Sequence, residues 1–504
     1  MSINQRPGVY ITESAVQSLA VGDTPSDAIA AFVGQTYSGP TQSGVGVPTA
    51  VTSWSQFVTQ FGGFSDTSLA LPFAVFNFFN NGGSLCYVTR VLGASAVAAT
   101  KTLADRGATP HNTLSLTALN EGAWGNSLRV EVVDRSTGRF DLRIYLGGSA
   151  ASNIVETWTD LSMTNSDARY VVNVLNAVGA GSSYVVAADL NSTNATPADT
   201  PLAGLSTAFT SGSNGSAVAS GDYANTVSAL DQVQHSLTLN IPAVSSVTII
   251  NSAIAYCEGR GDVFLVIDPT AGQTPAQAIT EQATYTASSY AAYYYPWIVM
   301  NDPSSAVPNA TRNTAPGGAV MGVIASTDLA AGAWQAPAGL RARLSGAFNL
   351  ERKLASTDLD SLNANYINAI RNHPVGGICV FGARTLSKST SVRYVPVRRE
   401  LIYIKDNVKR LLDPYIFENN DSSTWLSVST TLTQFLSNEW SQGGLAGATS
   451  DQAFYVVCDE TNNTPATIAA GELHATIGVA LESPTEFIVI NIGQWQGGST
   501  AFEA

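Results

Sequence analysis

Residues that could do chemistry are few and far apart in this sequence of 504 residues. Asp268 ends an apolar run at 263–267, and Asp302 follows another at 296–300. In a parallel sheet, these positions would lie beyond the carboxyl ends of the strands, where α/β proteins bind ligands. Two aspartates with no base, nucleophile or glycine-rich loop are weak evidence for a site. Helix caps and turns are therefore the favoured interpretation.

The four histidines and four cysteines add little chemistry. None forms the close pairs that zinc sites and redox motifs need, and no Gly-x-Ser-x-Gly, Gly-Lys-Ser/Thr or His-Glu-x-x-His motif occurs. We therefore expect no catalytic residue, cofactor or metal, and we expect the cysteines to be buried thiols in a reducing compartment. A hydrolase assembled from distant residues stays a rival, since one histidine suffices for a triad. The residues concerned are His111, His235, His373, His474, Cys86, Cys257, Cys379 and Cys458.

The composition favours a protein that buries its surface against partners. Hydrophobic residues make up 45% and charged residues 12%, against a usual charged share of about 25%. A net charge of -14 argues against nucleic-acid partners and anionic membranes. No apolar run is long enough for membrane insertion, and residues 1–8 lack a signal-peptide pattern.

Apolar runs and helical spacings predict an α/β fold, α+β overall. The first compact segment has the pattern of a strand, two helices and a second strand. A βαβ unit is predicted further along the chain. Two amphipathic helices near the C-terminus share one apolar spacing. The predicted strands are 30–34, 86–91, 263–267 and 296–300, and the predicted helices are 53–61, one ending at 79, 275–293, 397–412 and 425–436.

Shifts in composition divide the chain into six segments. Residues rich in Ala, Ser, Thr and Asn, with a hairpin pattern at 128–133 and 140–145, indicate a β-rich insertion in the α/β pattern. The predicted segments are an N-terminal arm at 1–27, a core at 28–93 and 236–340, an outward-facing insertion at 94–235, a C-terminal α+β domain at 341–485 and a C-terminal arm at 486–504.

Both ends of the chain carry a strand pattern without a local partner. A strand of this kind pairs with a distant segment or with another chain, and main-chain bonds then provide the attachment. We therefore predict that the two ends add to sheets of neighbouring subunits. The residues concerned are Val9, Tyr10, Ile11, Thr12, Phe487, Ile488, Val489, Ile490 and Ile492.

The few charges are sorted along the chain. Residues 341–410 hold 13 Lys/Arg against 5 Asp/Glu, whereas residues 411–504 hold none against 11. This basic band pairs either with the acidic end of its own domain or with an acidic neighbour, which is another copy of the chain or a different protein. Nucleic acid is the weakest alternative. The candidate contacts are Arg398, Arg399, Lys405, Lys409 and Arg410.

Ordered strings along nearly the whole chain resemble contractile phage tail sheath proteins. Tyr366 and Asn420 depart from the family pattern, where glycine and proline are common, and this leaves the local turns open. The strings include Pro7-Gly8-Val9-Tyr10, Phe61-Gly62-Gly63, Gly122-Ala123-Trp124-Gly125-Asn126, Tyr294-Tyr295-Pro296-Trp297, Phe381-Gly382-Ala383-Arg384, Tyr394-Val395-Pro396-Val397-Arg398-Arg399 and Phe417-Glu418-Asn419-Asn420-Asp421.

The resemblance implies a structural protein rather than an enzyme. It implies a subtilisin-like α/β core without a catalytic triad, and hexameric rings stacked helically around a tail tube. Contraction would drive the tube through the host envelope. Copies of itself, the tail tube protein, and baseplate and tail terminator proteins would be its partners, in a virion assembled in the host cytoplasm. The sheath of a phage-derived injection or bacteriocin particle remains an alternative.

Overall fold

The computed structural model describes residues 29–42, 44–135, 138–486, 493–496 and 499–502. It divides into two compact units. The large unit comprises Ala28–Ser326 and Ala338–Gly382, and the described part of the small unit comprises Thr327–Pro337 and the chain from Ala383 onward. The sequence predicted a boundary at 340/341. Residues 341–382 join the large unit because their strand β19 pairs with β15 of that unit.

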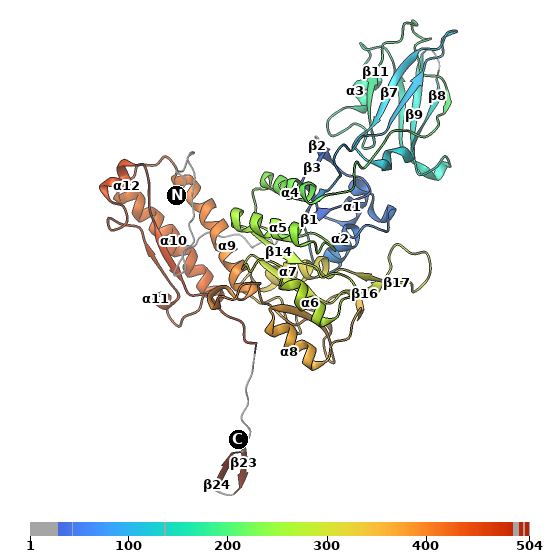
Figure 1. Ribbon diagram of the computed structural model, residues 1–504. Coiled ribbons are helices and arrows are strands. Elements are labelled where there is room, and N and C mark those ends of the chain that lie inside the picture. Colours follow the sequence, from blue (N-terminus) through green and yellow to red (C-terminus); the bar gives the residue numbers. More distant parts are fainter. Residues whose placement is uncertain (1–28, 43, 136–137, 487–492, 497–498, 503–504) are drawn as a thin grey trace. The chain divides into compact units, whose positions relative to one another are not determined.

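An eight-stranded sheet forms the core of the large unit (Figure 1). Its strand order is β20-β19-β15-β14-β13-β1-β5-β4, parallel except for the two outer strands. Every residue of β1 and β14 is buried, as expected of parallel strands covered on both faces. The strands are β1 (Ile29–Gly34), β4 (Thr49–Val51), β5 (Cys86–Arg90), β13 (Leu237–Asn240), β14 (Val263–Ile267), β15 (Ala291–Tyr295), β19 (Ile367–His373) and β20 (Gly377–Val380).

The helices of the large unit begin and end at the expected signals. In α1, the Ser53 side chain accepts the Gln56 N–H and Gly62 ends the helix at φ 83°, a conformation that glycine adopts without strain. The predicted helices at 53–61 and ending at 79 are thus confirmed. The helices are α1 (Trp54–Phe61), α2 (Leu71–Asn80), α4 (Ser220–Ser228), α5 (Val247–Arg260), α6 (Pro275–Gln282), α7 (Gly317–Ala331, whose last residues belong to the small unit) and α8 (Ser356–Ala364).

The predicted βαβ unit at 263–300 is wrong in its second half. Helix α6 ends at Gln282, and the next parallel strand is β15, not residues 296–300. Residues 298–301 form β16, which pairs antiparallel in a separate sheet with β17 (Thr311–Thr314) and β18 (Ala347–Leu350). Tyr293, Tyr294 and Tyr295 are buried. Aromatic strand propensity and burial outweigh the helical spacing here.

The β-rich insertion consists of two small antiparallel sheets around its own apolar core. The predicted hairpin is confirmed, since β8 and β9 pair from Leu128 with Leu146 to Asp134 with Phe140. The chain has returned to the core by α4, which contacts α5 and β1, earlier than the predicted end at 235. The elements are β6 (Thr100–Ala104), β7 (Asn112–Ala118), β8 (Leu128–Asp134), β9 (Arg139–Leu146), β10 (Ile154–Ser162), α3 (Val171–Leu175), β11 (Val185–Asp189) and β12 (Gly204–Leu205).

Arg90 ties the insertion to the sheet that carries it. Its side chain is fully buried at the end of β5, and it donates to the backbone oxygens of Glu121 and Tyr37. Asn214, on the returning chain, accepts a third, longer bond. Burial lowers the pKa of Arg90 to about 10, and the nearby Glu121 charge opposes this shift. One guanidinium thus holds both crossings between core and insertion.

Two long helices, the short helices α11 (Ser450–Ala453) and α12 (Pro465–Ala469) and a two-stranded sheet make up most of the small unit (Figure 1). Helix α9 (Val395–Leu412) and helix α10 (Ser422–Gln442) pack through Ile404, Val408, Leu432 and Phe435. Asp421 caps α10, as its position before the apolar stripe predicted. The strands are β21 (Phe454–Val457), β22 (Thr476–Val479), and a separate hairpin of β23 (Gly493–Gln496) and β24 (Ser499–Phe502).

Candidate subunit-interaction residues

The predicted strand-adding residues lie outside the described residues. These are Val9, Tyr10, Ile11, Thr12, Phe487, Ile488, Val489, Ile490 and Ile492. The described hairpin that follows them pairs β23 with β24 and with no other described strand. A lone two-stranded hairpin is marginally stable in water.

Two of the five candidate basic contacts are buried inside the small unit. Arg398 is 3% exposed and Arg399 is 6% exposed. Arg399 forms a two-pronged ion pair with Asp328 at the end of α7, with 2.7 Å between Nη1 and Oδ1. These two arginines are therefore structural residues of the subunit, because a partner surface cannot reach a guanidinium that the chain itself covers.

The other three candidates lie further along α9, toward its C-terminal end. Arg410 pairs with Asp406 one turn earlier, Lys405 is half-buried, and Lys409 is exposed in the last turn. Cations in a last helical turn are also stabilised by the helix dipole. Lys409 and Arg410 can therefore meet a partner, whereas Arg398 and Arg399 cannot.

A buried glutamate lies beside these arginines. Glu400 on α9 is 1% exposed, and neither carboxyl oxygen has a hydrogen-bond partner. Burial raises the pKa of Glu400 well above its usual range, the charges of Glu439 and Asp328 raise it further, and Arg399 opposes them. Burial therefore favours the protonated form of Glu400 in the folded protein. Its burial could have been predicted from the sequence, because Glu400 lies one helical turn before Ile404 and two turns before Val408, on the apolar side of the helix.

The basic band is joined to the acidic end of the chain by the ion pair of Arg384 with Glu486. Arg384 binds the Glu486 carboxylate through two nitrogens, with 2.9 Å from Nε to Oε1. Arg399 and Arg410 pair instead with carboxylates of the small unit outside that acidic end. Internal pairing therefore accounts for at least these charges of the basic band.

The two aspartates that could have formed a ligand site are not brought together. Asp268 is buried and accepts hydrogen bonds from the Asn240 side chain and from the N–H groups of Ala243 and Gly317. It thereby caps the first residue of α7. Asp302 bonds Ser304 and pairs with Arg312, next to the antiparallel sheet. Both aspartates therefore have the structural roles that the sequence favoured: Asp268 caps a helix, and Asp302 stabilises a turn.

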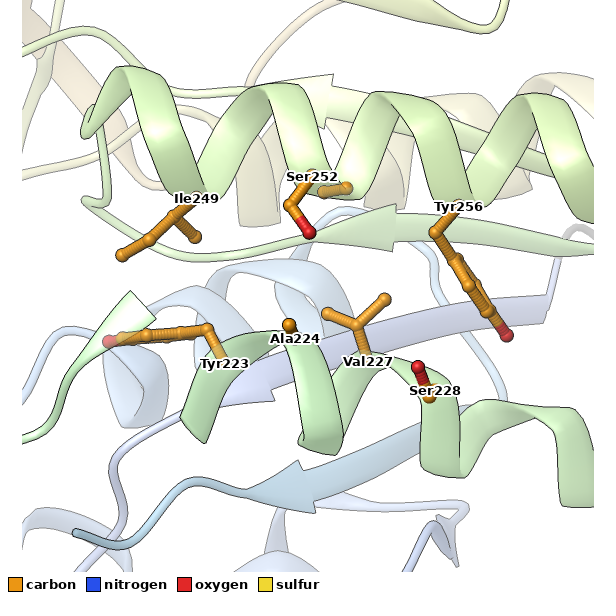
Figure 2. Close-up of a pocket in the computed structure, with 8 residues that line it drawn as sticks. Tyr223, Ala224, Val227, Ser228, Ile249, Ser252 and Tyr256 are labelled. Carbon is orange, nitrogen blue, oxygen red and sulfur yellow. The ribbon is translucent and has the colours of Figure 1, made fainter. Parts of the chain in front are cut away.

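A small pocket between α4 and α5 lacks the groups that catalysis needs (Figure 2). Its lining contains no carboxylate, histidine, lysine or cysteine. The phenol of Tyr256 is engaged by Asp231 and Arg260, and burial raises its pKa. The lining residues are Tyr223, Ala224, Val227, Ser228, Ile249, Ser252, Ala253 and Tyr256.

The described part of the chain also lacks other marks of a cofactor or membrane protein. No group of three or more His, Cys, Asp or Glu side chains is arranged to hold a metal ion there. No described helix is long and apolar enough to cross a membrane. The four cysteines are buried and unbridged, as predicted.

Two adjacent family models match the chain. The phage tail sheath protein central domain matches residues 216–386, and the phage tail sheath C-terminal domain matches residues 387–494. The tail sheath protein of Vibrio phage KVP40 is 30% identical over 227 residues, and that of Enterobacteria phage T4 is 28% identical over 225 residues. These matches cover 45% and 44% of this chain, and each spans 32% of the relative's own length.

Solved structures resemble the chain over nearly its whole length. A chain of the anti-feeding prophage baseplate matches with a TM-score of 0.59 at 21% identity, over 98% of this chain and 100% of that one. The sheath complex of an extracellular contractile injection system, in its contracted state, gives 0.59 at 22% identity over 98% and 99%. A sheath tail protein from Listeria innocua gives 0.61 at 14% identity over 88% and 90%. At these identities the likeness is one of fold.

Together, the two models cover residues 216–494, more than half of the chain, and the fold extends the likeness to both sides of that range. The sites considered above offer no assembled catalytic group, in keeping with a structural role. The chain belongs to the phage tail sheath protein family.

Proposed function

We propose that this protein is the subunit of a contractile sheath. Copies assemble as hexameric rings, stacked helically around a tail tube, and contraction drives the tube through a host envelope. The observation that carries this proposal is the pair of sheath models that match end to end over residues 216–494. The tube, baseplate and terminator proteins are the proposed partners, and the virion tail, assembled in the host cytoplasm, is the proposed location.

The core of the large unit is proposed to be a subtilisin-like sheet that lacks the triad. Six parallel strands flanked by helices support this. Within the described residues, His474 pairs with Glu472, His373 accepts two backbone N–H groups and His111 contacts Asn194. None of these contacts joins a serine or cysteine to a histidine, as a triad requires.

Electron microscopy of the purified full-length protein tests the function. Striated tubes are expected, because heterologous contacts between identical subunits build rings and helices. Dispersed monomers with hydrolytic activity would overturn the proposal in favour of the rival enzyme.

The two terminal segments are proposed to join neighbouring subunits by strand addition. The lone hairpin β23–β24 supports this at the C-terminal end, since its outer edges have no described strand partner. Deletion of residues 1–12 is expected to leave a folded, soluble subunit that forms no tubes. Normal tubes from this deletion would refute the role of the N-terminal segment.

The exposed end of α9 is proposed to contact the tube. Charge reversal at Lys405 and Lys409 is expected to weaken co-assembly with the tube protein. Exposed pairs are worth about 0.2–1 kcal/mol each, so six-fold repetition would make the loss visible. Lys101→Glu/Lys388→Glu, two reversals outside α9, is the matched control. Unchanged co-assembly would assign these lysines to pairing within the subunit.

A phage-like injection or bacteriocin particle is a second candidate. The observation in its favour is the match over 98% of the chain to structures of an anti-feeding prophage and an extracellular injection system. The curated phage relatives match over only 32% of their length. Genes for capsid and DNA packaging beside this gene would indicate a virion, and their absence from a complete tail-gene cluster would indicate an injection particle.

A further inference from the structure

Near the outer edge of the large sheet, two arginines lie on opposite sides of one cysteine. Arg371 on β19 is the register partner of Cys379 on β20, and Arg343 is bridged to the same Cys379 from the other side. Side chains at directly paired positions project from the same face of a sheet. Consistent with this, both guanidinium charges lower the pKa of Cys379, against the larger effect of burial. Two positive charges therefore flank one buried thiol.

An aromatic ring and a histidine extend this group along the same face. The Arg371 guanidinium lies 3.8 Å from the ring centre of Phe381, and the His373 ring stacks on Phe381 at 5.9 Å. Phe381 is 41% exposed. We call Arg343, Arg371, His373 and Phe381 the arginine face.

The arginine face has no anion of its own. Neither Arg343 nor Arg371 has a carboxylate partner among the described residues, and the Nε of Arg371 is buried without a hydrogen bond. Arg341, two positions before Arg343, is also exposed and has no carboxylate partner among the described residues. A carboxylate from outside could accept hydrogen bonds from these guanidinium groups, and such charge-assisted bonds are stronger than neutral ones.

The small unit has the complementary excess. Glu418, Glu460 and Glu482 are exposed and have no cationic partner among the described residues. They belong to the last 94 positions, which contain 11 carboxylates and no lysine or arginine. Each subunit therefore presents unpaired cations on one unit and unpaired carboxylates on the other.

We propose that the arginine face of one subunit binds exposed carboxylates of the small unit of a second copy. The contact is heterologous, since it joins two different patches, and repeated contacts of this kind build rings or helices rather than closed dimers. This inference deepens the proposed sheath function by naming a subunit contact. It adds a charge-based contact to the strand addition proposed for the chain ends.

Complementary charge reversals test the contact in the full-length chain. The first variant is Arg343→Glu/Arg371→Glu, and the second is Glu418→Lys/Glu460→Lys/Glu482→Lys. The control is Lys101→Glu/Lys388→Glu, which changes the net charge as much as the first variant at two sites outside the arginine face. Circular dichroism confirms folding, and sedimentation and electron microscopy measure assembly at about 50 mM salt, where screening is weak.

Each charge-reversed variant is expected to need at least tenfold more protein for half-assembly than the wild type or the control. An equal mixture of the two variants is expected to recover assembly, because each reversed patch then meets a reversed partner. Normal assembly of the first variant would overturn the contact, as would a mixture of two folded variants that does not recover. If the first variant loses only the binding of a short DNA duplex, the face recognises nucleic acid and the proposal is also overturned.

The outcomes separate this contact from the sheath function. Wild-type tubes together with normal tubes from the first variant leave the function standing and remove the contact. Wild-type oligomers that are not tubular, yet depend on Arg343, leave the contact and remove the sheath. A wild type that stays monomeric at all concentrations removes both.

Discussion

Arginines of the same basic band are held in opposite ways in the two units. In the small unit, Arg399 is buried and pairs with Asp328, and the pKa of the neighbouring buried Glu400 is raised. In the large unit, Arg343 is exposed and Arg371 lies against an aromatic ring, and neither forms an ion pair with a described carboxylate. This comparison shows that positive charges close together in a sequence can have different structural roles. One part of it builds the subunit, and the other part remains available to a partner.

The largest expected effect comes from breaking the buried pair. Asp328→Ala leaves the Arg399 guanidinium buried without its main counter-charge, which costs about 3–5 kcal/mol of unfolding free energy. Urea unfolding of the purified subunit measures the loss. The double variant Asp328→Leu/Arg399→Leu is expected to recover much of it, since it removes both charges. A loss below about 1 kcal/mol for the single variant would show that water reaches this arginine.

A buried acid of the large unit gives a second, smaller effect. Burial raises the pKa of Asp268 from 3.8 to about 6, although three hydrogen bonds oppose the shift. The protonated form is favoured in the folded protein. Stability from this group is therefore fully present below about pH 3.8 and is lost as the pH rises to about 6, which amounts to about 3 kcal/mol.

Asp268→Asn is expected to flatten this dependence between pH 4 and 6. Below pH 4 the variant is expected to be less stable than the wild type by about 1–3 kcal/mol, because one accepting oxygen is lost, and the deficit shrinks as the pH rises to 6. Thermal unfolding across this range measures both effects. Asp451→Asn, at an exposed site of the small unit, is the control. An Asp268→Asn profile parallel to that of the wild type would contradict the raised pKa.

Glu400 gives the matching pH effect in the small unit. Its folded pKa lies above the ordinary value of 4.5, so its stabilising contribution is complete below about pH 4.5 and is lost as the pH rises through the folded pKa. Glu400→Gln keeps the shape and removes the titration. The variant is expected to hold its melting temperature at alkaline pH better than the wild type. A variant that loses stability with pH as steeply as the wild type would assign the dependence to another group.

The smallest effect on stability is expected at the arginine face. Arg343→Ala removes an exposed side chain that has no partner in the described subunit, so the unfolding free energy is expected to change by no more than about 0.5 kcal/mol. Urea unfolding measures this beside Asp328→Ala. A loss comparable to that of Asp328→Ala would abolish the contrast between the two arginine environments.

Local patterns were sufficient for much of the fold. The hairpin of β8 and β9, the capped helices α1 and α10 and the apolar strands β1 and β14 all form at or close to the predicted positions. Each rests on neighbours in the sequence, such as a capping side chain or a period of two. The prediction of a helix to residue 293 followed by a parallel strand at 296–300 was wrong, because β15 is specified by its pairing with β14 and β19 and by burial. Its own residues favour neither strand nor helix clearly.

The candidate residues were harder to place than the elements. The sequence located the basic band but could not say that Arg398 and Arg399 are inside the subunit, because Asp328 lies 71 positions from its partner. It also did not single out Arg343 and Arg371, which are 28 positions apart and meet only across Cys379.

The sequence by itself determined the mixed fold, the sorting of charge along the chain and the family to which the chain belongs, because composition, periodicity and ordered strings are local or additive properties. Only the tertiary structure decided which charges are paired, buried or open. Strand register and helix packing bring distant residues together, and the free energy of a charge depends on what surrounds it rather than on its position in the chain.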